Sequence, residues 1–290
     1  THYFHQESGR YLRAVNAIKD AGYAKTYGFY QYLLKSSPEE AERKLKAAGE
    51  RGDMVHRAID LLLSAEPGKP FTLKREEGIF NRETRQHQPL ANDEWDALLA
   101  WTRFMERHGA EVVVSEAPVY NLTENYAGTA DALVVLTKEC GIRNCRCKEF
   151  VGKLGLYDWK TSGALYPEYE AQVAAYFKGD NIGEYADGKL PEYGALLRVG
   201  TNHVTTGGYE IRFMDFQDVR DGWMRFLAAL TISNREYKPF DPESDIKDIP
   251  DEIVFTPQTL TFKPKPKVKK PATKKSRGRK PKTPKANGTS

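Results

Sequence analysis

The stretch LGLYDWKTS, residues 154–162, combines the pattern of a buried β-strand with two residues of opposite charge. Side chains of a strand alternate between the two faces of a sheet, so Leu154 and Leu156 share one face. Continuing the alternation places Asp158 and Lys160 on that same face. The acid and the base at the end of this strand could form a surface ion pair, or they could belong to one edge of a functional site.

Two further strand patterns, each with its own acid, precede this stretch. YAGTADALVVL (126–136) contains Asp131, and EVVVSEAPVYN (111–121) contains Glu116. Only a turn insertion, residues 137–153, separates YAGTADALVVL from LGLYDWKTS, so we expect these two strands to be neighbours. Converging carboxylates repel each other unless a cation lies between them, and Mg²⁺ prefers such oxygen ligands. A lysine beside the metal could orient or deprotonate a water molecule and stabilise charge on a phosphate.

Helical patterns surround the strands. They span residues 11–66, 92–109, 166–179 and 215–237. Within the first we expect Ser37 to cap a helix, and Gly49 and Gly52 to divide the segment that follows into two helices. Asn92 should cap the helix of 92–109. Residues 67–91 resemble an exposed connector, and 192–200 with 207–214 resemble a pair of hairpin strands.

This order of elements predicts an α/β fold with a mixed central β-sheet flanked by helices. We expect an N-terminal helical region over 1–110, a core over 111–262 and a Lys/Pro-rich tail over 263–290. The tail has too little apolar surface to fold alone and should be disordered. No run of about 18 apolar residues occurs, so no membrane-spanning helix is expected.

The formal net charge of +4 conceals two regions of opposite charge. Residues 263–290 contain 12 of the 44 Lys and Arg residues and no acidic residue. The remaining 32 basic residues face 40 acidic ones, so residues 1–262 have a net charge of −8. An acidic body with a basic tail predicts a polyanionic partner such as DNA, contacted through the tail.

Four short motifs occur in a fixed order along the chain. They are GDMVH (52–56), GTAD (128–131), DWK (158–160) and QVAAY (172–176). On a helix, two strands and a helix respectively, they resemble the motifs of the PD-(D/E)XK nuclease superfamily, specifically its RecB-like exonuclease branch. The segment before the first motif is similar to that of phage-encoded members. The resemblance covers about residues 11–178 and implies a restriction-endonuclease-like core.

The resemblance also implies a role for each matching residue. The metal ligands would be His56, Asp131, Asp158 and the backbone carbonyl of Trp159. The catalytic residues would be Lys160, Asp158, Asp131 and Glu116, the last at a position where an acid is common but variable in this branch. Gln172 and Tyr176 would order the site and approach the nucleic acid.

The implied activity is that of a Mg²⁺- or Mn²⁺-dependent deoxyribonuclease, an exonuclease in phage or bacterial recombination, repair or DNA processing. Its partners would be DNA and a recombination or single-strand-binding protein, in the cytoplasm of a bacterium or phage-infected host. Two alternatives stay open. A non-catalytic DNA-binding module could retain the fold, although the intact acid–acid–lysine set argues against it. A restriction-type endonuclease is the other, although no specificity domain is evident.

The three cysteines of the chain lie close together in the insertion between the two acid-bearing strands. They are Cys140, Cys145 and Cys147. A structural Zn²⁺ site needs four ligands, and only three thiols are local, so a fourth ligand would have to come from a histidine elsewhere or a second chain. The local count favours free thiols on an exposed hairpin. Some CRISPR-associated relatives in the superfamily hold an iron–sulfur cluster on four cysteines, a pattern that this chain lacks.

The basic tail suggests a flexible DNA tether. Its densest part contains Lys274, Lys275, Arg277, Arg279 and Lys280. The sequence RGRKP resembles an AT-hook, in which Arg side chains enter the minor groove, but Lys280 interrupts the usual Arg-Pro step. We therefore expect non-specific neutralisation of phosphates, which would offset the repulsion between DNA and an acidic body.

Overall fold

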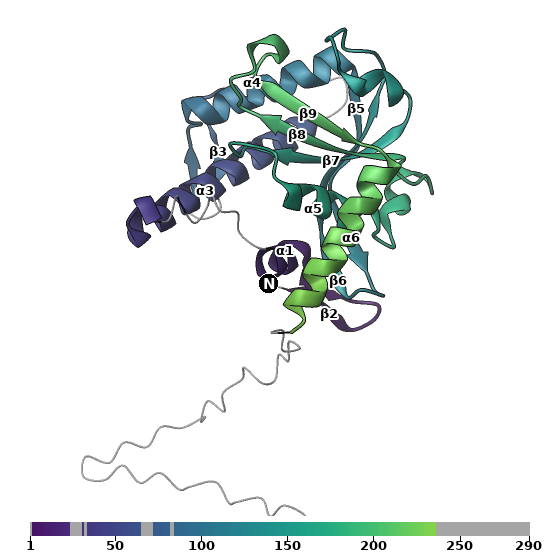
Figure 1. The fold of residues 1–290 in the computed structure, drawn as a ribbon. Coiled ribbons are helices and arrows are strands. Elements are labelled where there is room, and N and C mark those ends of the chain that lie inside the picture. Colours follow the sequence, from purple (N-terminus) through teal and green to yellow (C-terminus); the bar gives the residue numbers. More distant parts are fainter. Residues whose placement is uncertain (1, 24–30, 32–33, 65–71, 82–83, 236–290) are drawn as a thin grey trace, which may run out of the picture. The chain divides into compact units, whose positions relative to one another are not determined.

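A seven-stranded mixed β-sheet forms the centre of the computed structural model, which describes residues 2–23, 31, 34–64, 72–81 and 84–235 (Figure 1). Its strands are β1 (His2–His5), β2 (Arg10–Ala14), β5 (Ala110–Asn121), β6 (Tyr126–Leu136), β7 (Leu154–Lys160), β8 (Tyr193–Val199) and β9 (Tyr209–Met214). A separate hairpin consists of β3 (Ile79–Asn81) and β4 (Gln86–Gln88). The helices are α1 (Val15–Gly22), α3 (Pro38–Leu63), α4 (Asn92–His108), α5 (Pro167–Phe177) and α6 (Phe216–Ser233), with short 3₁₀ turns η1 (Arg146–Glu149), η2 (Ile182–Ala186) and η3 (Val204–Thr206).

Strand β6 lies at the centre of this sheet. Antiparallel β5 pairs along the whole of one edge of β6. The other edge is shared: β2 pairs in parallel with Tyr126 and Ala127, and β7 pairs antiparallel with residues 132–135. Beyond β7 the order continues with parallel β8 and antiparallel β9. On the shared edge, residues 128–131 have no partner strand within the described part of the chain.

Helices cover both faces of the sheet (Figure 1). Two hydrophobic cores lie between the helices and the sheet. Helices α3 and α4 pack on one face, where Tyr157 and Trp159 of β7 are buried. Helices α1, α5 and α6 pack on the other, over Leu154 and Leu156. Strand β7 therefore keeps the alternation expected from its sequence, and Asp158 follows Leu156 on the face that α5 covers.

The predicted α/β fold with a mixed central sheet is confirmed. Two expectations for the N-terminal part are wrong. Strand β2 occupies Arg10–Ala14, so residues 11–14 of the segment expected to be helical are extended, and their pairing with β6 and β1 explains the difference. Helix α3 is also continuous through Gly49 and Gly52, because its buried residues Met54, Val55, Ala58 and Ile59 anchor it to the core.

Two of the three helix ends predicted from the sequence have the expected residue at the cap. Ser37 caps α3, since its hydroxyl accepts the backbone N–H of Glu40 at 3.1 Å. Gly109 ends α4 in the left-handed region, at φ 56°. Asn92, however, is the first helical residue of α4 and not its cap, because Ala91 occupies the cap position and the Glu94 carboxylate accepts the Ala91 N–H at 2.7 Å. The region predicted to be a connector also contains the β3–β4 hairpin.

Candidate metal centre

Strands β6 and β7 separate at the predicted site residues. Ala132 pairs with Tyr157, so the antiparallel register would next place Asp131 opposite Asp158, but the pairing ends there. The carboxylate of Asp131 instead accepts the backbone N–H of Trp159, with 2.6 Å between Oδ2 and N. A side-chain hydrogen bond thus bridges the two strands where their backbones diverge, and two acids flank the divergence.

Helix α3 brings His56 to the same point. Its Nδ1 lies 3.4 Å from Asp131 Oδ1, and its Nε2 lies 3.0 Å from the carbonyl oxygen of Trp159. Burial lowers the pKa of His56, but the charge and hydrogen bond of Asp131 outweigh burial and raise the pKa to about 9. The ring is therefore an imidazolium at neutral pH, and its two N–H groups contact a carboxylate and a carbonyl.

Glu116 completes a group of three potential ligands. The register of β5 and β6 places it opposite Asp131, between the pairs Ser115–Ala132 and Ala117–Ala130. Among the described residues, ligand atoms of Glu116, Asp131 and His56 all lie within 4.8 Å of one another. Glu116 adopts φ 50°, an unfavourable left-handed conformation for a residue with a side chain. Such local strain is often found at functional sites.

Asp158 and Lys160 form an ion pair beside this group. The Lys160 ammonium lies 2.5 Å from Asp158 Oδ2, and the Asp158 side chain is only 1% exposed. Neither carboxylate oxygen of Asp158 has a hydrogen bond of good geometry within the described part of the chain, although the ammonium is close. The structure thus separates the two predicted acids: Asp131 contacts His56, and Asp158 contacts Lys160.

Burial and neighbouring charges together shift the pKa values of these side chains, upward for Asp158 and Lys160 and downward for Asp131. Burial raises the pKa of Asp158, and the charge of Lys160 only partly opposes this. Burial also acts to raise the pKa of Asp131, but the charge and hydrogen bond of His56 bring it below its usual value. Burial lowers the pKa of Lys160, but Asp158 and Asp131 outweigh burial and hold it above its usual value. Lys160 is therefore suited to donate hydrogen bonds and stabilise negative charge, not to act as a base.

Helix α5 places Gln172 and Tyr176 against β6. Gln172 Nε2 donates to the Tyr176 hydroxyl at 3.2 Å, and both side chains are buried. The ring of Tyr176 rests on Gly128, where an added Cβ would come within 2.7 Å of Tyr176 Cε1. The glycine that precedes Asp131 by three residues is thus needed for close contact with α5, which connects two of the motifs in one packing arrangement.

Lys19 of α1 is a site residue that the sequence did not reveal. Its ammonium donates to Gln172 Oε1 at 3.2 Å and lies 5.6 Å from the centre of the Tyr169 ring. Lys160 lies 4.9 Å from the same ring centre. Burial, followed by the charge of Lys160, lowers the pKa of Lys19. No motif surrounds Lys19 in the sequence, so only the packing of α1 on α5 identifies it.

A cleft of about 700 Å³ gives access to these side chains. Its lining includes His56, Asp131, Lys160, Gln172 and Tyr176, together with Lys19. The walls come from α1, α3, α5, the middle of β6, and the end of β7 with the loop that follows it. Side chains from all four motifs therefore line one cleft, whereas Asp158 and Glu116 are not among its lining residues.

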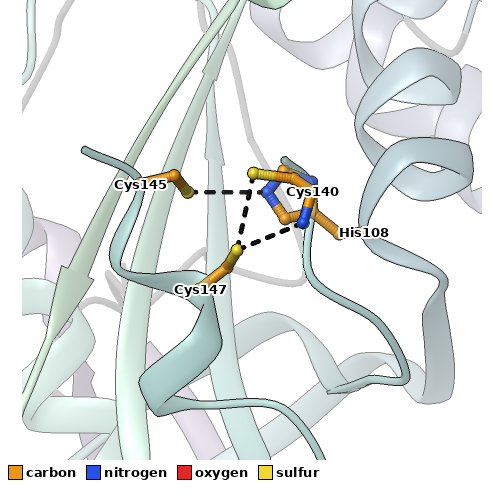
Figure 2. Close-up of side chains that lie close together, drawn as sticks. All are labelled: His108, Cys140, Cys145 and Cys147. Atoms are coloured by element: carbon orange, nitrogen blue, oxygen red, sulfur yellow. Dashed lines mark hydrogen bonds between the residues drawn. The ribbon is translucent and has the colours of Figure 1, made fainter. Parts of the chain in front are cut away.

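A second group of potential metal ligands lies elsewhere, in the connection between β6 and β7. His108, Cys140, Cys145 and Cys147 place their ligand atoms within 4.8 Å of one another (Figure 2). Cys147 is buried and the other two cysteines are half-buried, so the expectation of an exposed hairpin is wrong for this cluster. His108 was not identified from the sequence, because it lies at the end of α4, far from the cysteines along the chain.

The predicted DNA tether, including Lys274, Lys275, Arg277, Arg279 and Lys280, lies outside the described residues. Among the helices that the structure describes, none has the length and apolar character needed to cross a membrane. Comparison with models of known protein families gives no match, and a search of curated proteins gives none.

Proposed function

We propose that this cleft hydrolyses DNA phosphodiester bonds with the help of Mg²⁺ or Mn²⁺, and that the chain is a member of the RecB-like branch of the PD-(D/E)XK nucleases. The observation that carries the proposal is the convergence of His56, Asp131 and Glu116 next to the Asp158–Lys160 pair. A cluster of acids at a divergence of two strands, with a buried lysine beside it, fits metal-assisted phosphoryl chemistry.

The donor set fits a hard divalent cation. Asp131 and Glu116 offer carboxylate oxygens and Trp159 offers a carbonyl oxygen, while His56 offers an imidazole nitrogen once the arriving cation displaces its proton. The His56 imidazolium already contacts the Asp131 carboxylate and the Trp159 carbonyl, so a positive charge at this position is favourable. Oxygen ligands of this kind suit Mg²⁺ and Mn²⁺. Bound there, the cation would polarise the scissile phosphate and lower the pKa of a water molecule.

The protein side chains supply the remaining functions. Lys160, held by Asp158, donates hydrogen bonds to the phosphate oxygens and positions the attacking water. Asp158 holds that ammonium in place from a position that is almost fully buried. Gln172 and Tyr176 support the wall of the cleft, and Lys19 adds a second positive charge along the path of the phosphate backbone.

DNA is the proposed substrate because the proposed cation, the lysines of the cleft and the tail can neutralise phosphates on an otherwise acidic body. Lys19, Arg51 and Lys160 line the cleft, together with three aspartates that a divalent cation would partly neutralise, and the tail of residues 263–290 contributes twelve further positive charges. We propose that the enzyme degrades linear DNA from its ends, in phage or bacterial recombination, repair or DNA processing within the cell, together with a recombination or single-strand-binding protein.

A digestion assay tests this function. Linear duplexes, linear single strands labelled at either end, and covalently closed circles are incubated with the protein in Mg²⁺, Mn²⁺ or EDTA. We expect metal-dependent loss of linear DNA and intact circles. Lys160→Gln should abolish cleavage, whereas Lys189→Gln, at an exposed lysine outside the cleft, should leave it unchanged.

Each alternative predicts a different result. Binding of DNA without cleavage in either metal would overturn the nuclease proposal in favour of a non-catalytic module. Metal-dependent cleavage of closed circles would overturn the exonuclease assignment in favour of an endonuclease. Equal activity of Lys160→Gln and the wild type would show that the hydrolysis takes place at another site.

A further inference from the structure

The cluster of His108, Cys140, Cys145 and Cys147 lies outside the cleft and joins three parts of the chain (Figure 2). His108 is the last residue of α4, Cys147 belongs to η1, and the other two cysteines lie between β6 and η1. Cys140 Sγ and Cys147 Sγ are 3.4 Å apart, and Cys145 Sγ lies 3.8 Å from His108 Nε2. Side chains distant in the sequence thus converge on one point.

These distances are compatible with a tetrahedral zinc site. With Zn–S bonds of about 2.3 Å and Zn–N bonds of about 2.0 Å, neighbouring ligand atoms in a tetrahedron lie roughly 3.5–3.8 Å apart. The sulfur pair at 3.4 Å and the sulfur–nitrogen pair at 3.8 Å each lie within about 0.4 Å of the tetrahedral values, which are about 3.8 and 3.5 Å respectively. Three thiolates and one imidazole are among the ordinary donor sets of structural Zn²⁺ sites.

The orientation of His108 also suits a metal ligand. Its Nδ1 lies 3.2 Å from the carbonyl oxygen of Phe104, one turn earlier in α4, so Nδ1–H donates and the proton is located there. The lone pair of Nε2 therefore faces the sulfur atoms. The ring is fully buried between the aromatic rings of Phe104 and Tyr209, at centroid distances of 4.5 and 5.9 Å. Metal-binding histidines typically have such a bond from the second ring nitrogen.

The backbone of the connection is shaped around the sulfur atoms. The N–H of Cys140 donates to Cys147 Sγ, and the N–H of Ile142 donates to Cys140 Sγ, both at 3.4 Å. Gly141 makes the second contact possible by adopting φ 70°. Hydrogen bonds of this kind favour the charged thiolate over the neutral thiol. Two backbone N–H groups of the loop thus donate to sulfur atoms that would be negatively charged thiolates when a metal is bound.

We propose that His108, Cys140, Cys145 and Cys147 bind one structural Zn²⁺ ion. All four positions of the tetrahedron come from the protein, and the cluster lies at the margin of the core formed by α3, α4 and the sheet, so the site is closed and not catalytic. The ion fastens the β6–β7 connection to the end of α4. That connection joins the strands of Asp131 and Asp158, so the ion stabilises the register on which the cleft depends.

Metal analysis of the full chain tests the proposal independently of any nuclease activity. The protein is purified without chelator, dialysed against metal-free buffer and analysed for zinc and iron. We expect about one zinc per chain in the wild type and in Lys160→Gln, and loss of most of it in Cys145→Ser and His108→Gln. His203→Gln, a matched variant at an exposed histidine, should keep its zinc.

Replacement of zinc by Co²⁺ gives a second readout that does not depend on the folding of a variant. The wild type should show the ligand-field bands of tetrahedral Co²⁺ together with thiolate-to-metal charge transfer. A wild type without zinc or tetrahedral Co²⁺ would overturn the proposal. So would iron with visible charge-transfer absorption, or a disulfide between Cys140 and Cys147 revealed by a mass lower by two hydrogens.

Discussion

Asp131 Oδ2 lies 2.6 Å from the backbone nitrogen of Trp159, and this hydrogen bond replaces the main-chain pairing that ends at Ala132 and Tyr157. The same carboxylate contacts His56 through its other oxygen. One side chain therefore connects two diverging strands and helix α3. The proposed metal centre is located at this junction, so its geometry depends on the register of the sheet.

Gly128→Ala should reduce both stability and activity, because its Cβ would come within 2.7 Å of the Tyr176 ring. We expect a loss of about 1–3 kcal/mol in the free energy of unfolding, measured with urea. Gly49→Ala is the matched control in α3, where an added Cβ meets no atom within 4 Å and should stabilise the helix by about 0.5–1 kcal/mol. Wild-type stability in Gly128→Ala would refute this packing argument.

The stability of the metal-free protein should depend on the titration of His56. Its folded-state pKa is raised to about 9 from 6.5, so its contribution is fully present below pH 6.5 and is lost as the pH rises through 9. Because the side chain is 26% exposed, we expect an effect of roughly 2 kcal/mol. In EDTA, wild type and His203→Gln should lose this stability between pH 6.5 and 9, whereas His56→Gln should not. Parallel curves for His56→Gln and wild type would contradict the prediction.

Lys19→Gln should weaken the interaction with substrate more than it slows the chemical step. Lys19 supports Gln172 and adds a charge to the cleft, but it does not belong to the group of potential ligands. We expect KM for linear DNA to rise about tenfold, with a much smaller change in kcat. Steady-state kinetics at fixed ionic strength measures both. A large fall in kcat with unchanged KM would instead place Lys19 among the catalytic residues.

Removing residues 263–290 should lower DNA affinity and its dependence on salt. The segment contains twelve positive charges, and each phosphate contact adds about 0.9 to the slope of log affinity against log salt concentration. A tail of equal length with glutamine at the twelve positions should behave like the truncated chain, and kcat at saturating DNA should not change. An unaltered salt dependence would rule out the tail as a tether.

Local patterns were sufficient to predict the strands of the site. The alternation in β7 located Asp158 on the face of Leu156, and the segments of β5 and β6 were evident from their β-branched residues. The continuity of α3 could not be predicted, because tertiary contacts of residues such as Met54 and Ile59 override two helix-weakening glycines. Helix propensity reflects the conformational preference of a single residue, and it contains no information on the core against which the helix packs.

Contacts between distant segments were beyond the sequence patterns. His108 meets the cysteines only because the β5–β6 hairpin returns the chain to the end of α4, where the Lys138 N–H donates to the His108 carbonyl at 3.2 Å. Lys19 reaches Gln172 only through the packing of α1 on α5. Both are single residues without a surrounding motif, so spacing along the chain gives no indication of their neighbours.

Single-turnover cleavage of an end-labelled linear duplex in Mg²⁺ tests the central claim most directly. Asn at position 131 can still accept the Trp159 N–H but lacks the carboxylate charge. We therefore expect Asp131→Asn to stay folded, by near-ultraviolet circular dichroism, and to cleave about 1,000-fold or more slowly than wild type. Asp96→Asn, at an exposed acid of α4, should cleave at the wild-type rate. Wild-type cleavage by Asp131→Asn, or equal cleavage by the wild type in EDTA, would contradict the account.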